Sequence, residues 1–543
     1  MAITVADAFD DSRLSAVERE NQSRWKLSWP EFKLLFIAST GFFIDAYDLF
    51  NINLVVVILN FVVNGKLSGT IANAPLQGGV LKAAANIGCV VGQIAFGLAG
   101  DVFGRKAIYG IEMMVTTLAT ILIIAAPLSL GAGLFTYITI FRVLMGIGIG
   151  GDYPMSASVV ADRANLRRRG TMVTFIFAMQ GWGSLIGGLV FIILLAIYKK
   201  GVQTHGHLGQ LNSVWRIYTG LIIIPAVITI AQRLLMPEST RMKGVHAVRE
   251  DPSLITKGRV IGVKPDHSAE KVGEGSEKVA EGSEDGDREA AHTAARRLAA
   301  TKAGRAAAWR EARVYFSEWR HLKILIGTTM SWFLLDIIFY GISLNQAIFI
   351  SALGLASSKD PWEFLWQQGV ANVVIAVGGF LPGYYFTLFT IEYIGRKPIQ
   401  IMGLTMNAII FAVMAGKYTA LKADASGLIA CFIFLQFFFN FGANATTFVI
   451  PAEVFPTRVR GFSHGLSAAC GKCGAIIASL AVSIMSTNVG AQNVLWLFCG
   501  VAIVCIPFTF LIPETKDRDA DVVDLEERRA AAALGGAGET EKI

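Results

Sequence analysis

Long apolar stretches separated by short polar turns run through most of the chain. A helix that crosses a hydrocarbon core about 30 Å thick needs roughly 20 predominantly apolar residues. Twelve stretches meet that requirement, at 33–63, 78–101, 106–127, 133–160, 170–198, 214–236, 321–352, 365–391, 397–417, 425–452, 461–487 and 490–513. The pattern therefore predicts an all-α membrane protein with twelve transmembrane helices.

Polar segments divide these helices into two groups of six. We expect a tail at 1–32, a six-helix bundle at 33–236, a central loop at 237–320, a second bundle at 321–513 and a tail at 514–543. The loop run EKVGEGSEKVAEGSEDGD is too poor in large apolar residues to bury a core, so we expect disorder there. The basic stretch near 289–320 predicts a helix, either solvated or lying on an anionic membrane surface. The central loop is thus a candidate for binding anionic lipid or regulators.

The composition agrees with a protein embedded in lipid. Of the 543 residues, 53% are apolar and 16% are charged, whereas ordinary soluble domains have about 25% charged residues. All six cysteines lie inside apolar runs, and the C-x-x-C pair Cys470 and Cys473 lacks a βαβ context. We expect neither a disulfide framework nor a metal or other cofactor. The sequence also lacks a nucleophile elbow and a phosphate-cradling loop, so we do not expect an enzyme.

Basic residues gather in the short loops that follow the second, fourth, eighth and tenth helices. Such loops are typical of the cytoplasmic side of a membrane. We therefore expect both termini in the cytoplasm, and we attribute the net charge of +7 to membrane topology rather than to nucleic-acid binding.

Two motifs recur at one fixed displacement. Asp101-x-x-Gly104-Arg105-Lys106 returns 291 positions later as Glu392-x-x-Gly395-Arg396-Lys397. The motif that begins Ala161-Asp162 and ends Arg167-x-Arg169-Gly170 returns, at the same displacement, between Ala452-Glu453 and Arg458-x-Arg460-Gly461. Two independent motifs with one displacement indicate two parallel six-helix repeats.

Together with Arg142-x-x-x-Gly146-x-Gly148 in the fourth helix, these loop motifs resemble those of the major facilitator superfamily. The resemblance implies that two halves rock about a site near the middle of the membrane. Loop acids and arginines can form charge networks that hold one gate closed. Our candidates for such gating networks are Asp101, Arg105, Asp162, Arg167, Glu453 and Arg458.

Few ionisable residues lie deep in the predicted helices, and each is a candidate for function because burial in lipid costs at least a few kcal/mol. They are Asp45, Asp48, Glu112, Arg142, Asp152, Asp336 and Lys472. In the superfamily, helices one, four, seven and ten line a common cavity, where several carboxylates cannot all stay ionised. This favours proton coupling. The alternative is a fixed ion pair, such as Asp45 with Arg142 or Asp336 with Lys472, and the role of Glu112 stays open.

The fourth-helix stretch from Gly150 to Asp162, GGDYPMSASVVAD, closely resembles the signature of the phosphate:proton symporters of fungi and plants. By that resemblance, the proton-coupling group comprises Asp45, Asp48 and Asp152, with Arg142 as a candidate ion-pair partner. The phosphate ligands map onto Tyr153, Gln180, Trp332, Asp336, Tyr340 and Asn444, with Lys472 as a nearby cation. Residues 332, 336 and 340 are each four apart and share one helical face.

We therefore expect proton-coupled import of inorganic phosphate across the plasma membrane. Phosphate near neutral pH keeps an O–H that can donate to Asp336, whereas sulfate has none and would face an unpaired carboxylate. Import into a negative-inside cell also needs more than one proton per phosphate. Two alternatives stay open: a sugar or organic-ion porter of the same superfamily, and a phosphate transporter that also acts as a nutrient sensor.

Overall fold

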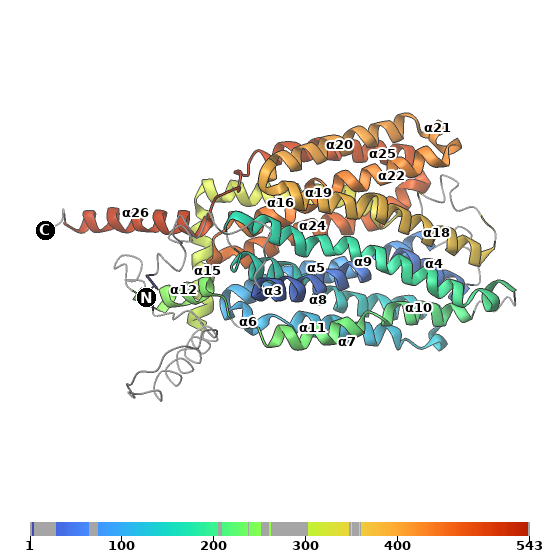
Figure 1. Ribbon diagram of the computed structural model, residues 1–543, viewed down its shortest axis with the longest axis horizontal. Coiled ribbons are helices and arrows are strands. Elements are labelled where there is room, and N and C mark those ends of the chain that lie inside the picture. The colour runs from blue at the N-terminus through green and yellow to red at the C-terminus, as the bar shows by residue number, and fades with distance from the viewer. Residues whose placement is uncertain are drawn as a thin grey trace, which may run out of the picture.

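The computed structural model describes residues 3–4, 29–50, 52–64, 74–164, 166–204, 209–236, 238–250, 260–261, 302–346, 349, 358 and 360–540. Within these residues, twelve segments are long and apolar enough to cross a membrane, which confirms the twelve-helix prediction. Figure 1 shows the helices running side by side in an elongated bundle. The spans are Glu31–Val63, Gln77–Phe103, Arg105–Ile124, Gly133–Ala161, Leu166–Ile197, Gln210–Leu234, Trp319–Ser343, Pro361–Ile394, Arg396–Gly416, Ser426–Val454, Thr457–Val482 and Asn488–Thr509.

The first six spans contain α3 (Trp29–Phe50), α4 (Ile52–Asn64), α5 (Ala74–Phe103), α6 (Arg105–Ile108), α7 (Ile111–Ile124), α8 (Gly133–Ala161), α9 (Arg169–Ile197), α10 (Gln210–Gly220) and α11 (Ile223–Leu234). Short turns of 3-10 or π helix occur at Leu128–Leu130, Leu166–Arg168 and Lys200–Thr204. We call these six spans the first half.

The second half contains α16 (Trp319–Ser343), α18 (Pro361–Ile375), α19 (Leu381–Ile394), α20 (Arg396–Gly416), α22 (Ala425–Asn440), α23 (Ala443–Val454), α24 (Thr457–Met485) and α25 (Ala491–Thr509). The short helix α21 (Tyr418–Ala423) follows α20, and π turns occur at Ala376–Phe380 and Ser486–Gly490. The seventh span ends at Ser343, earlier than the expected residue 352. Leu344 is its C-cap, and the next residues, Asn345 and Gln346, are buried polar side chains.

Helices α12 (Thr240–Glu250), α15 (Lys302–Ser317) and α26 (Ala520–Thr540) lie outside the spans, together at one end of the bundle (Figure 1). We call this the charged end, because the buried arginine and acid networks described below lie there. The strands β1 (Ile3–Thr4) and β2 (Val260–Ile261) form one short antiparallel pair. The acidic run expected to be disordered lies outside the described residues, as do positions 289–301 of the expected basic helix; α15 covers much of the rest.

The two halves meet closely where α5 lies along α24. A Cβ atom added at Gly97 would collide with the carbonyl oxygen of Gly461, and one at Gly465 would collide with that of Gln93. Backbone therefore touches backbone across this seam, as small residues allow in membrane helices. The seam continues toward the opposite end of the bundle, where a Cβ at Gly79 would lie 2.9 Å from the carbonyl oxygen of Ser479.

Two spans are interrupted beside the centre of the bundle. The tenth span breaks at Phe441 and Gly442, and the freed carbonyl of Asn440 accepts a hydrogen bond of 2.7 Å from the hydroxyl of Thr387. The eighth span contains a π turn just before Pro382, whose missing N–H cannot continue the helical ladder. Irregular backbone of this kind is tolerated at membrane depth only where other protein groups satisfy it. Both interruptions bring polar side chains to the centre.

Candidate substrate and proton site

A buried ion pair lies at the centre of the second half. The ammonium of Lys472, on α24, lies 3.3 Å from an oxygen of Asp336 on α16. The same ammonium donates to the hydroxyl of Tyr340, one helical turn further along, at 2.5 Å. Of the two ion pairs that the sequence suggested, this one is present. It presents a cation, a carboxylate and a phenol to the same small region.

A chain of hydrogen bonds joins this region to the first half. The amide of Gln180 on α9 donates to the hydroxyl of Tyr153 on α8 at 2.8 Å, and accepts from Tyr384 on α19 at 3.2 Å. Asn444 on α23 donates to the same Tyr384 hydroxyl at 2.9 Å. These hydrogen bonds therefore connect the first half with the second. Sequence reasoning missed Tyr384, because nothing distinguishes it from its aromatic neighbours.

Aromatic rings connect the Lys472 ion pair with this chain of hydrogen bonds. The Lys472 ammonium lies 5.1 Å from the centre of the Tyr153 ring and 4.3 Å from that of Tyr340. The rings of Tyr153 and Trp332 have centroids 6.5 Å apart. All seven expected phosphate ligands are thus buried in one continuous cluster between the halves. Their role as ligands stays a prediction.

Aromatic layers close the cluster on both sides. Toward the charged end, the rings of Phe177 and Phe448, one from each half, stack with centroids 4.4 Å apart. Toward the opposite end, the ring of Phe50 stacks on that of Tyr340 at 5.8 Å. Since these contacts join the halves above and below the cluster, the structure corresponds to an occluded arrangement.

The first half contains a second charged cluster, which is built around Arg233. This guanidinium, fully buried on α11, lies 2.8 Å from Glu112 and binds both oxygens of Asp152, at 2.7 and 3.0 Å. The ring of Tyr109 covers it at 4.4 Å. The sequence analysis missed Arg233 because it lies at the end of the sixth span, where a charged residue is indistinguishable from an ordinary loop residue. The signal was indirect: buried acids need a countercharge.

Two further acids of the first half have no such partner. One carboxylate oxygen each of Asp45 and Asp48, and one guanidinium nitrogen of Arg142, are buried without a hydrogen bond among the described residues. Asp48 and Arg142 line the same pocket of about 20 Å³, which holds roughly one water. The suggested pair of Asp45 with Arg142 does not form among the described residues. A charged carboxylate buried without a partner costs several kcal/mol, and a proton on it removes that cost.

Asp45 lies one helical turn from the Arg233 cluster. A Cβ atom added at Gly41, four residues earlier on α3, would collide with the side chains of both Arg233 and Asp152. Helix α3 therefore packs directly on the ion pair. Asp45, with one buried oxygen that has no hydrogen bond among the described residues, therefore lies beside an acid whose charge Arg233 compensates.

The charged end carries two networks that follow the sequence repeat. Arg105 pairs with Asp162 and, at 3.5 Å, with Asp101. At the equivalent positions of the second half, Arg396 binds Glu392 at 2.8 Å and Glu453 at 2.6 Å. All six residues belong to the repeated motifs that the sequence analysis identified, and four of them are among the predicted gating residues: Asp101, Arg105, Asp162 and Glu453.

Each network also holds a helix of the opposite half. The carboxylate of Asp101 accepts from the backbone N–H groups of Gly461 and Phe462, at 3.0 and 2.7 Å, and that of Glu392 accepts from Thr171 at 2.9 Å. Both acids therefore interact with the positive start of a helix across the seam. Arg460 adds an ion pair to Asp162 between the halves, whereas Arg167 is exposed on the surface.

The start of the C-terminal segment joins these networks. Asp519 pairs with Arg169 at 3.2 Å and with Arg241 at 2.8 Å, and Asp521 pairs with Arg241 at 2.7 Å and with Arg460 at 3.3 Å. Burial by itself raises the pKa of Asp521, but the guanidinium groups of Arg460 and Arg241 and the N–H of Thr457 hold that pKa well below its usual range. The tail thus binds both halves and the central loop.

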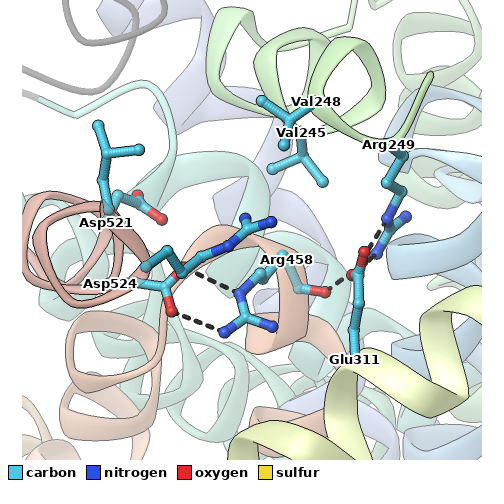
Figure 2. A pocket seen from close by; sticks show the side chains of 9 residues that line it. Val245, Val248, Arg249, Glu311, Arg458, Asp521 and Asp524 are labelled. Atoms are coloured by element: carbon cyan, nitrogen blue, oxygen red, sulfur yellow. Dashed lines mark hydrogen bonds and ion pairs between the residues drawn. The ribbon is translucent and has the colours of Figure 1, made fainter. Parts of the chain in front are cut away.

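Beside this junction, α12 and α15 complete the charged end (Figure 2). Arg249 of α12 binds Glu311 of α15 at 3.0 Å, and Arg458 binds Asp524 of α26 at 2.7 Å. Arg249 also donates to the backbone oxygen of Asp101 at 2.7 Å. Helices α12 and α15 are therefore linked by these bonds to each other and to Asp101 of the Arg105 network, and α26 is linked to Arg458 of α24.

Comparison with known proteins yields consistent matches over almost the whole chain. Residues 34–525 match the sugar (and other) transporter family. The repressible high-affinity phosphate permease of Neurospora crassa is 34% identical over 539 residues, covering 94% of this chain and 89% of its own. The inorganic phosphate transporter PHO84 of Saccharomyces cerevisiae is 34% identical over 540 residues, covering 96% and 88%. The solved proton:xylose symporter XylE has a similar fold, with a TM-score of 0.66 at 19% identity, covering 92% of this chain and 98% of its own.

Proposed function

Because the chain belongs to the sugar (and other) transporter family of the major facilitator superfamily, alongside fungal phosphate transporters, we propose that it imports inorganic phosphate together with protons. The observation that carries this proposal is the central group of Lys472, Asp336 and Tyr340. It combines one cation, one hydrogen-bond acceptor and one hydroxyl, all buried, where the second half meets Tyr153 of the first half. That combination fits an anion that still carries a proton.

Selectivity follows from the same three groups. The ammonium of Lys472 offsets the charge of phosphate as a single point charge, without the fork of a guanidinium, which favours release over very tight capture. The carboxylate of Asp336 accepts the phosphate O–H, so a fully deprotonated sulfate would face an uncompensated like charge. Amide and indole groups from both halves, such as Asn444 and Trp332, would then bind the remaining oxygens.

Proton coupling is assigned to the first half. Asp45, like Asp48, has a buried carboxylate oxygen without a partner among the described residues, but only Asp45 lies next to an acid that Arg233 already neutralises. Asp48 and Arg142 line one small pocket, on the side away from the charged end. In this scheme Asp45 exchanges the proton, while Asp152 and Glu112 stay ionised against Arg233. Binding of phosphate and of protons would both favour closure of the site.

The charged end would form the cytoplasmic gate, with both termini in the cytoplasm. Its short loops contain the basic residues that the positive-inside rule places there. Residues 33–236 and 321–513 would act as two bundles that separate at this end when the networks of Arg105 and Arg396 open. For a protein that takes up an external nutrient, we propose a location in the plasma membrane. Helix α15, with exposed Trp309 and Val314 beside Arg310 and Arg313, would lie on the anionic membrane surface.

Uptake by the purified protein in proteoliposomes tests the function. We expect labelled phosphate to accumulate when an inward proton gradient is imposed, excess xylose to leave this accumulation largely unchanged, and labelled sulfate not to accumulate. A pH electrode should register proton uptake that requires phosphate. Accumulation of xylose, or phosphate uptake that is indifferent to the proton gradient, would contradict the proposal.

A further inference from the structure

A buried lysine at the end of the bundle opposite the charged end has no role in the scheme above. Lys82, on α5, is 7% exposed, and its ammonium donates to the side-chain oxygen of Asn345 at 3.3 Å. An ammonium has three donors, and among the described residues no carboxylate lies within ion-pair distance of this one. A buried cation without a countercharge is costly, and it stabilises any anion that reaches it.

Lys82 lies at the junction of the two halves. Its partner Asn345 follows the end of α16, and close by the amide of Asn53 on α4 donates to the backbone oxygen of Ser343 at 2.7 Å. One turn before Lys82, Gly79 packs against the backbone of Ser479 on α24. The contacts of Lys82 and Asn53 therefore close the bundle at this end, and both must open when the site faces outward.

Helix geometry puts this lysine directly outside the central site. Gly79 contacts Ser479 and Gly97 contacts Gly461, so α5 and α24 run antiparallel in a fixed register. In that register the backbone of Lys82 lies about one turn, roughly 6 Å, beyond Lys472. Asn345 follows Asp336 by nine residues, or about 13 Å. The two lysines are consecutive cations along the seam.

We propose that Lys82 and Asn345 form an outer anion site, which takes phosphate from outside before it reaches Lys472. This inference rests on the proposed function. When the outer gate opens, the Asn345 contact separates and the ammonium faces incoming anions; when the anion moves inward, the contact forms again. The outer site has no carboxylate among the described residues, so it accepts sulfate as well as phosphate. Selection against sulfate then occurs only at Asp336.

Uptake kinetics of three single variants test this site. We expect Lys82→Gln to raise the KM for phosphate about tenfold, with a maximal rate within about twofold of wild type, since the cation that captures phosphate is lost. Lys82→Arg should stay close to wild type. Lys422→Gln, which removes an exposed lysine at the same end, is the matched control and should change neither parameter.

Sulfate provides a readout that a merely structural lysine would not affect. High external sulfate should inhibit phosphate uptake competitively in wild type without being transported, and Lys82→Gln should lose that inhibition. Asn345→Asp, which keeps the lysine but supplies a permanent anion, should raise the KM in the same way and serves if Lys82→Gln does not fold. An unchanged KM, or a lower maximal rate with unchanged KM, would overturn the outer site. Absence of phosphate uptake by wild type would instead overturn the proposed function.

Discussion

The two halves place an aspartate at the same position and surround it differently. Asp45 of the first half and Asp336 of the second are displaced by 291 residues, like the loop motifs. Asp336 has the ammonium of Lys472 beside it, whereas one oxygen of Asp45 has no partner among the described residues. Lys472 is equivalent to Gly181, so the first half cannot form the same pair. The repeat supplies the scaffold, and the unequal positions supply the chemistry.

A second contrast concerns Arg233. Near the ends of the halves the displacement becomes 276 residues, as Pro237-Glu238 and Pro513-Glu514 show, and Arg233 then corresponds to Thr509. Where the first half has a buried ion triad, the second has neutral hydrogen bonds from Gln400 to Thr509 and from Thr446 to Gln400, at 2.8 and 2.9 Å. At these equivalent positions, buried charge therefore occurs only in the half to which we assign the protons.

Removal of Arg233 should have the largest effect. In Arg233→Gln, Glu112 and Asp152 remain buried without a countercharge, which we expect to cost about 3–5 kcal/mol of stability. Thr509→Val at the equivalent position should cost about 1–3 kcal/mol, because only neutral groups lose a partner. Thermal unfolding in detergent measures both. The double variant Arg233→Gln with Glu112→Gln should recover part of the loss, and equal costs at the two positions would remove the contrast between the halves.

Asp336→Asn should remove phosphate binding. The change replaces the charged acceptor of the phosphate O–H with a neutral amide and takes the countercharge from Lys472, and loss of one partner of a buried charge pair costs about 2–5 kcal/mol. We expect the affinity to fall by about 30-fold or more. Equilibrium binding of labelled phosphate measures it, with Asp424→Asn, at an exposed helix cap, as the control. An unchanged affinity of Asp336→Asn for phosphate would mean that phosphate does not bind at this position of the second half.

Asp45→Asn should separate binding from accumulation. Phosphate affinity should stay within a few-fold of wild type, since Asp45 does not contact the central group in any described hydrogen bond. Under an inward gradient of one pH unit, the variant should lose about a tenfold accumulation for each coupled proton. Proteoliposome uptake with and without the gradient measures this. If Asp45→Asn and Asp336→Asn lose binding and accumulation equally, the division of labour between the halves is wrong.

Asp521→Asn should have the smallest effect, and one that depends on pH. The lowered pKa of Asp521 contributes stability that is fully present above the usual aspartate value near 4 and is lost as the pH falls through the folded-state value. The stability difference from wild type should be constant between about pH 5 and 8 and should shrink by about 1 kcal/mol per pH unit below 4. Unfolding temperatures across this range measure it. A difference that varies near neutral pH would assign proton sensing to the charged end as well.

The sequence predicts the architecture well, because hydrophobic length and repeated loop motifs are local signals. It also identifies Asp45, Asp336 and Lys472, since a charge within an apolar run is conspicuous. It does not identify Arg233 or Lys82, which lie near helix ends where charges are ordinary, nor Tyr384, which lies in an aromatic run. The pairing of Asp519 and Asp521 with arginines of both halves depends on how distant helices pack. These contacts exist only in three dimensions, and no spacing in the chain records them.

The backbone contact between α5 and α24 has a consequence for speed. Because Gly97, Gly461 and Gly465 present no side chains at their contacts, the two halves meet there on a smooth surface, without knobs that must disengage before one half turns against the other. We therefore expect little steric resistance along the seam, so that the hydrogen bonds and ion pairs at the two ends of the bundle set the rate of switching. Substitutions in those end contacts should therefore make such a carrier faster or slower without any change in the glycine contacts between α5 and α24.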